Sequence, residues 1–191
     1  KKKGRGFYVD IGAHHPIQRN NTNLLFQKGW EGINVDVNEF SIDLFNFLRP
    51  NDLNLLAAIS DSEGEISFYY QKKFSQLNTT DKKIANEHFQ GNYKERVVKC
   101  QTIQSILDNS KYKNKKIDFL NLDIEGNEIN ALKSLNFKKY CPKLICVEIH
   151  RYPLNSSKSG NLKSNPIYKF LLKKGYNQVW ENEFSFIFRR N

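Results

Sequence analysis

Short apolar runs of strand length alternate along the chain with segments whose apolar residues repeat at helical spacing. The predicted strands are 6–12, 32–37, 54–60, 65–71, 117–124, 144–149, 178–180 and 184–189. The predicted helices lie at 22–28, over 40–48, around 84–89, from Thr102, after Gly126 and from Pro166. This alternation predicts an α/β fold with a doubly wound, mainly parallel sheet that ends in an antiparallel hairpin. The pattern contains no internal repeat and no second domain, so we expect one domain over residues 1–191.

Some details of this pattern carry specific expectations. The run 54–60 is continuously apolar, which is typical of a strand covered on both faces. Thr22 is placed to cap its helix, and Gly29 is placed to end it. Residues 72–96 are polar and weakly patterned, with only a hint of a short helix. Inserts of this kind often carry substrate contacts, so we expect substrate choice to lie there and in 150–165.

Polar residues follow the predicted parallel strands where each strand ends. They are Asp10 to His15, Asp36 to Glu39, Ser60 with Asp61, Asp123 to Glu128, and Glu148 to Arg151. Ligands of open α/β sheets bind beyond the carboxyl ends of the strands. Because each of these strands ends in an acid or a hydroxyl, the sequence predicts a binding cleft along that edge of the sheet.

The first two strands resemble the nucleotide-binding half of a doubly wound fold. The first ends in Asp10 and breaks at Gly12, and the second ends in Asp36. The Gly-x-Gly-x-x-Gly fingerprint of dinucleotide-binding proteins is absent. The form Asp-x-Gly-Ala, which ends at Ala13, favours S-adenosylmethionine as the cofactor, since this ligand has a ribose but no pyrophosphate.

Each residue of this half has an expected role and an alternative. Asp36 is predicted to accept the two ribose hydroxyls. Asp10 and Gly12 shape the loop around the methionine part, although Asp10 could instead only brace that loop through backbone N–H groups. Ser60 and Asp61 are placed either to meet the adenine edge or to form a simple turn.

The candidate catalytic residues are Asp123, Glu125, Glu148 and His150. Transfer to a hydroxyl needs an aligned acceptor and a base, and the pKa of histidine suits His150 for that role. A histidine after a strand is also often structural, so both interpretations stay open. Glu128 is well explained as a partner of a helix dipole. No metal-type histidine or cysteine spacing is present, and we expect no metal, although a magnesium site at Asp123 and a neighbour remains open.

Five ordered motifs resemble the FkbM-type methyltransferases, and together they cover about residues 7–150. They are Phe-Tyr-Val-Asp-Ile-Gly-Ala-His-His-Pro (7–16), Asn-Asn-Thr-Asn (20–23), Lys-Gly-Trp-Glu-Gly-Ile-Asn-Val-Asp (28–36), Phe-Leu-Asn-Leu-Asp-Ile-Glu-Gly-Asn-Glu (119–128) and Lys-Leu-Ile-Cys-Val-Glu-Ile-His (143–150). The resemblance implies the class I, Rossmann-like methyltransferase sheet with a reversed C-terminal strand. It also implies O-methylation of a sugar, glycan or small secondary metabolite with S-adenosylmethionine.

The resemblance places Asp123, Glu125 and Gly126 in the Asp-x-Glu-Gly motif beside the transferred methyl group. The full set of expected cofactor-binding residues is Asp10, Gly12, Ala13, Asn21, Thr22, Asp36, Ser60, Asp61 and Asp123. Two departures from the common pattern matter. Only Gly12 of the usual loop glycines is kept, and Asn121 stands where the family often has lysine.

Composition leaves two further interpretations open. The formal net charge of +10 is consistent with an anionic partner, but the lysines are scattered, as on a solvated surface. We therefore expect a small-molecule or glycan acceptor, which includes anionic ones, and not nucleic acid. An RNA methyltransferase is the second enzyme interpretation, although no Asn/Asp-Pro-Pro-Tyr/Phe motif supports it. A non-catalytic binding domain that retains the fold is the third.

The cysteines and the hydropathy bear on the compartment. The three cysteines, Cys100, Cys141 and Cys146, are an odd number without close metal-type spacing. Cys141 and Cys146 flank the start of an apolar run and are interpreted as reduced core residues, which favours a reducing, cytoplasmic setting. No apolar run approaches the ~20 residues that span a bilayer.

Overall fold

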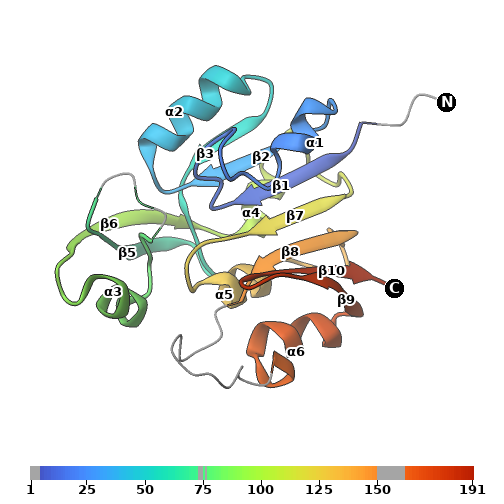
Figure 1. Ribbon diagram of the computed structural model, residues 1–191. Helices are drawn as coiled ribbons and strands as arrows, with labels where there is room; N and C mark the ends of the chain where they lie inside the picture. The colour runs from blue at the N-terminus through green and yellow to red at the C-terminus, as the bar shows by residue number, and fades with distance from the viewer. Residues whose placement is uncertain (1–4, 73–74, 76, 150–161) are drawn as a thin grey trace.

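The main sheet runs in the order β3-β2-β1-β7-β8-β10-β9 in a computed structural model that describes residues 5–72, 75, 77–149 and 162–191 (Figure 1). Its strands are β1 (Phe7–Ile11), β2 (Glu31–Asp36), β3 (Leu53–Leu56), β7 (Phe119–Leu122), β8 (Leu144–Glu148), β9 (Tyr176–Glu181) and β10 (Ser185–Arg190). The five strands from β3 to β8 are parallel, and β10 is antiparallel to both of its neighbours. The predicted fold class, including the reversed C-terminal strand, is therefore confirmed.

The helices lie between the strands along the chain, as the alternation predicts. They are α1 (Asn23–Gln27), α2 (Glu39–Leu48), α3 (Lys82–Phe89), α4 (Ile103–Asp108), α5 (Glu128–Lys133) and α6 (Pro166–Lys173), with a 3₁₀ turn at Leu162–Ser164. Side chains of the preceding residues cap several of these helices. Thr102 Oγ1 accepts from the Ser105 N–H, and Asn165 Oδ1 accepts from the Ile167 N–H. These bonds satisfy backbone donors that the first turn of a helix leaves unpaired.

The central strands form the core because their side chains are apolar on both faces. All five residues of β1 are buried, and so are three residues each of β7 and β8. A parallel strand that is covered by helices on both sides loses water from both faces, so it favours a continuous apolar run over alternation. Strand β1 lies in the middle of the sheet, between β2 and β7, and its carboxyl end points into the site described below.

The predicted strand 54–60 is wrong as one element. It divides into β3 (Leu53–Leu56) in the main sheet and β4 (Ala58–Ile59) in a second sheet. Strand β3 is an edge strand whose residues are half-buried or exposed, whereas both residues of β4 are buried. The run is apolar because it serves two sheets in turn and not because both of its faces are covered.

The second sheet has the order β4-β6-β5, with β5 at Gly64–Tyr70 and β6 at Lys94–Gln101. Together with α3 it forms a small unit on the side toward which the arrowheads of β1, β7 and β8 point (Figure 1). The hint of a helix within 72–96 is confirmed by α3, but β6 is missed by the sequence analysis. Five of its eight residues are charged or polar and most are exposed, so it carries no apolar alternation.

Two smaller corrections concern α1 and α2. Thr22 does precede α1, but its hydroxyl makes no capping bond and donates to Asp10 instead. Helix α2 is formed where predicted, although Phe40 and Phe47 of the helical pattern are 56% and 82% exposed. Its buried face consists of Ser41, Ile42 and Phe45. The face of α2 that packs against the protein is therefore not the one that carries Phe40 and Phe47.

The three cysteines are free thiols, with Cys100 and Cys146 buried and Cys141 half-buried. Within the described residues, no helix has the length and apolar character needed to cross a membrane.

Candidate functional site

A cavity of about 280 Å³ opens at the carboxyl ends of β1, β2 and β7. Its lining comes from four regions: Asp10–His14 with Arg19–Asn21, Val35–Asn38, Ala57–Ile59, and Asn121 with Asp123–Glu125 and Glu148. Residues 72–96, called the insert below, add a further wall with Ser75 and Leu77–Thr80, and Phe68 of β5 lies beside them. The cleft that the strand ends predict is therefore present, and residues of the weakly patterned 72–96 segment help to close it.

Gly12 allows the loops after β1 and β7 to meet. Its φ is +79°, a left-handed conformation, and a Cβ built there would lie 1.8 Å from the carbonyl oxygen of Asp123. The N–H of Gly12 donates to the Val35 carbonyl at 2.9 Å. Glycine is needed at this position because no side chain fits between the two loops and because the backbone conformation disfavours other residues.

Asp10 braces the floor of the cavity. Its carboxylate is fully buried and accepts from Thr22 Oγ1 at 2.7 Å, Asn121 Nδ2 at 2.8 Å and Asn20 Nδ2 at 3.1 Å. Burial raises the pKa of Asp10, and the hydrogen bonds from Thr22 and Asn121 oppose that rise. The bracing alternative thus describes the geometry well, except that the donors are side chains and not backbone N–H groups.

Asp36 lies at the end of β2 and holds two loops by their backbone. Its Oδ2 accepts from the His14 N–H at 2.8 Å, and its Oδ1 accepts from the Asn38 N–H at 2.7 Å. Burial raises the pKa of Asp36 to about 6, against the opposing effect of these backbone bonds. Val37 also contributes a backbone hydrogen bond to this group. A carboxylate has about four acceptor sites, so the group can still accept a hydroxyl donor from the cavity.

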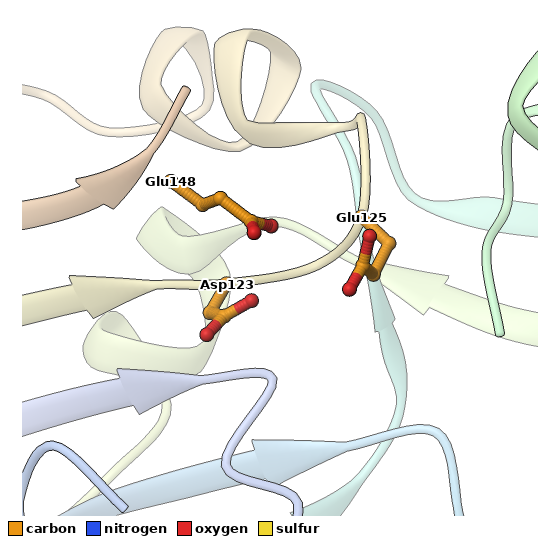
Figure 2. A group of neighbouring side chains, drawn as sticks. All are labelled: Asp123, Glu125 and Glu148. Atoms are coloured by element: carbon orange, nitrogen blue, oxygen red, sulfur yellow. The ribbon is translucent and has the colours of Figure 1, made fainter. Parts of the chain in front are cut away.

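Three carboxylates meet at the other end of the cavity. Asp123 follows β7, Glu148 ends β8, and Glu125 lies in the turn before α5, with one oxygen of each within 4.8 Å of the others (Figure 2). Desolvation, and then the charges of Glu148 and Glu125, raise the pKa of Asp123 well above its ordinary value. Oxygen donors of this kind are ligands that magnesium or calcium accepts, so the chemistry of the set is compatible with a hard divalent cation.

The turn that carries Glu125 is strained and well supported. Glu125 has a φ of +54° and Gly126 a φ of +109°. Glu128, which is 2% exposed, accepts from the backbone N–H groups of Ile124 at 3.0 Å and Gly126 at 3.1 Å. Thr79 Oγ1 donates to the Glu125 carbonyl at 2.5 Å and so joins the insert to the turn. Burial raises the pKa of Glu128 to about 7. The helix-dipole interpretation of Glu128 is incomplete, since its carboxylate also holds this turn.

The family model of the methyltransferase FkbM domain matches residues 10–177 of the chain. The chain belongs to the FkbM methyltransferase family. This match confirms the resemblance that the sequence motifs carry, and it includes every strand-end residue of the cavity, from Asp10 through Glu148.

A solved structure extends the comparison to the fold. The crystal structure of a methyltransferase FkbM from Methylobacillus flagellatus KT is similar to the chain, with a TM-score of 0.57 and 14% sequence identity. The match covers 97% of this chain and 43% of the other, so the chain spans less than half the length of that protein. At this identity the likeness concerns the fold alone. No curated protein matches the sequence significantly.

Asn121, which stands where the family often has lysine, makes hydrogen bonds that a lysine could not make. Asn121 is buried, its Nδ2 donates to Asp10, and its Oδ1 accepts from Asn21 Nδ2 at 2.9 Å. An amide can donate to one partner and accept from another at once, which lysine cannot do. Asn121 thus ties the Asp10 carboxylate to the loop that carries Asn21.

The other expected site residues fall into three groups. Ala13 and Asn21 line the cavity, whereas Thr22 lies beneath it in contact with Asp10. Ser60 and Asp61 follow β4 and do not line the cavity, although Ala57–Ile59 just before them do. His150 lies outside the described residues, so its role as a base stays a prediction.

The sequence analysis missed two contributors to this site. Phe68 of β5 lines the cavity, and Arg49 is buried beneath the cavity floor. Phe68 lies in an aromatic strand that was predicted, but nothing in the pattern indicates which face meets the cleft. Arg49 directly precedes Pro50 at the end of a helix, where an arginine ordinarily faces water.

Proposed function

We propose that this FkbM-family chain is an S-adenosylmethionine-dependent O-methyltransferase that acts on a hydroxyl of a sugar, glycan or small secondary metabolite. The observation that supports it best is the arrangement of one cavity with Asp36 on the β2 side and the three carboxylates Asp123, Glu125 and Glu148 on the other. A ribose acceptor and a negatively charged wall in one cleft fit a ligand that carries both a ribose and a sulfonium.

In this proposal the residues around Asp36 bind the nucleoside part of the cofactor. Asp36 accepts the ribose hydroxyls with the lone pairs that its backbone partners leave. The loop from Gly12 to Asn21 borders the methionine part, with Asp10 as its brace. Bound S-adenosylmethionine would supply the electrophilic methyl group, and the carboxylates favour its positive charge electrostatically. Ser60 and Asp61 remain candidates for the adenine edge only if the loop after β4 moves toward the cavity.

The carboxylate pair Asp123 and Glu148 is the proposed base. A carboxyl group with a raised pKa is a stronger proton acceptor than an ordinary carboxylate, and the pKa of Asp123 is raised well above its usual value. This pair would take the proton of the acceptor hydroxyl as its oxygen gains the methyl group that bound S-adenosylmethionine would supply, with S-adenosylhomocysteine as the other product. His150 is the alternative base from the sequence. We propose no metal, although the oxygen set is compatible with one.

The acceptor is proposed to lie against β5 and the insert, where Phe68 of β5 and the insert residues Ser75, Asn78 and Thr79 line the cavity. The lining contains five carboxyl groups, namely Asp10, Asp36, Asp123, Glu125 and Glu148, against the guanidinium of Arg19. Burial lowers the pKa of His14, so its imidazole is neutral near pH 7 and adds no positive charge. Although the whole chain is basic, this lining disfavours a strongly anionic acceptor. A reducing, cytoplasmic setting is proposed with it, on the number and spacing of the cysteines alone.

The test is transfer of tritiated methyl from S-adenosylmethionine to separate pools of neutral sugars, anionic glycans, small polyols and RNA. We expect labelled product with a neutral hydroxyl acceptor, and loss of label transfer in Asp123→Asn. The matched control is Asp43→Asn, on the exposed face of α2. Transfer to RNA alone would replace the proposed acceptor class, and transfer to none of the pools would favour a binding domain.

A further inference from the structure

The guanidinium of Arg49 is buried directly beneath the loop that borders the cavity. Arg49 ends α2 and is 1% exposed, although arginine is rarely buried without a partner of opposite charge. None of the ion pairs among the described residues includes it. Its carbon Cζ instead lies 4.9 Å from the ring centroid of Phe26 and 5.0 Å from that of Phe45.

The hydrogen bonds of Arg49 go mostly to one segment, the loop between β1 and α1. Nη2 donates to the Pro16 carbonyl and, at 2.9 Å, to Asn20 Oδ1. Nη1 donates to Thr22 Oγ1 at 2.9 Å and to the Tyr8 hydroxyl at 3.4 Å. A guanidinium presents several donors in a fixed plane, so one side chain fixes three points of this loop relative to α2.

Two of these contacts connect the cation to the site acid. Thr22 and Asn20 each accept from Arg49 with one atom, and each donates to Asp10 Oδ2, at 2.7 and 3.1 Å. The positive charge of Arg49 and the negative charge of Asp10 are thus linked through two neutral side chains. Such a linkage offsets the desolvation of both ions and orders the residues between them.

The loop needs this support because part of its backbone is strained. His14 and Arg19 have φ values of 52° and 50°, which are left-handed conformations that residues other than glycine rarely adopt. Conformations of this kind persist where the surroundings over-determine them. His14, Arg19, Asn20 and Asn21 all line the cavity, so the shape of this loop is the shape of one wall of the site.

We propose that Arg49 is a positioning residue, which touches no cofactor but holds the Pro16–Thr22 loop in its cofactor-binding form by linking it to α2 and to Asp10. The inference rests on the proposed function, since it requires that the cavity bind S-adenosylmethionine or its product. It assigns a binding role to a residue that lies outside the cavity lining.

The experiment measures the dissociation constant of S-adenosylhomocysteine by calorimetry, together with Tm, in variants of the full chain. Arg49→Met and Arg49→Lys are expected to weaken binding by about tenfold or more, because neither side chain reaches Pro16, Asn20 and Thr22 together. The matched control is Tyr176→Phe, which removes the buried hydrogen bond to the Pro142 carbonyl, 2.6 Å long, at the far end of the sheet. A lower Tm with unchanged affinity is expected for this control.

A second pair of variants decides the matter if the Arg49 variants do not fold. Thr22→Val removes the hydroxyl that joins Arg49 to Asp10, whereas Thr22→Ser keeps it, so the loss of affinity should be clearly larger in the first. If the wild-type chain binds the probe and folded Arg49→Met binds it equally well, the inference is wrong and the proposed function stands. Where Arg49→Met does not fold, equal binding by Thr22→Val has the same meaning. If the wild-type chain does not bind it, the proposed function fails and the inference falls with it.

Discussion

Substitution of Asp36 by alanine tests how the cavity holds a ribose. A carboxylate has about four acceptor sites, and the backbone bonds from His14, Asn38 and Val37 leave only part of this capacity for ribose hydroxyls. Loss of hydrogen bonds to a charged group costs about 1–3 kcal/mol, which is roughly a 5- to 150-fold increase in the dissociation constant. We expect an effect in that range for S-adenosylhomocysteine in Asp36→Ala.

The pH dependence gives this prediction a second readout. The pKa of Asp36 is raised to about 6 in the empty cavity, and hydroxyl donors bind its ionised form better. Affinity of the wild-type chain should therefore rise as the pH increases through about 6 and then level off. Other groups of the cavity titrate as well, so the quantity to compare is the difference between the wild type and Asp36→Ala, which isolates this carboxylate.

The assay is isothermal titration calorimetry at several pH values, with circular dichroism to show that each variant is folded. Asp43→Ala, an aspartate on the exposed face of α2, is the matched control and should bind as the wild type does. Equal affinity in folded Asp36→Ala at about pH 8, where the carboxylate is ionised, would refute the ribose assignment. If the difference in affinity between the wild type and Asp36→Ala does not change with pH, the raised pKa assigned to Asp36 is wrong.

Three further predictions concern the Asp-x-Glu-Gly turn. Asp123→Asn should lower kcat by about 10²- to 10⁴-fold in the methyl-transfer assay while binding of S-adenosylhomocysteine changes little; equal losses in both would make Asp123 a binding residue only. The pKa of Glu128 is raised from 4.5 to about 7, so its ionisation destabilises the fold as the pH rises between those values. Glu128→Gln should therefore gain up to about 3 kcal/mol of unfolding free energy above pH 7 and nothing below pH 4.5; thermal denaturation that shows the same gain at both pH values would contradict this. Gly126→Ala should lower Tm for two reasons: its Cβ would lie 2.1 Å from Ile84 Cδ1, and the φ of +109° disfavours a residue with a Cβ. Ile84→Ala added to this variant removes the contact and should restore only part of the lost Tm. Full recovery of Tm would mean that backbone strain at Gly126 is negligible.

The sequence predicted the elements that have a strong local signal. Strand β1 and the closing hairpin follow apolar periodicity, and α4 follows a capping threonine, so each is specified by adjacent residues. Strand β6 could not be found in this way, since it pairs with β5 by backbone bonds while its side chains face water. The division of 54–60 between two sheets likewise depends on tertiary contacts. Each half has the composition of a strand, so the local sequence does not show where the first strand ends and the second begins.

The difference between local signals and tertiary contacts also explains which site residues could be predicted from the sequence. Gly12 and Asp36 are visible in the sequence because a strand, a break and a terminal acid follow one another within a few residues. The joining of Asp123 with Glu148 could be anticipated from the order of parallel strands. The burial of Arg49 could not, since its partners lie 27 to 41 positions away in the chain and none of them is an acid.

The most direct test of the account is a pair of calorimetric titrations of the purified wild-type chain, one with S-adenosylhomocysteine and one with NAD. Asp36 is the proposed ribose acceptor of the cavity, and the sequence has no glycine-rich loop for a pyrophosphate, so the account predicts micromolar-range binding of the first ligand and none of the second. Binding of NAD alone, or of neither ligand, would contradict the central claim that this cavity is a site for S-adenosylmethionine.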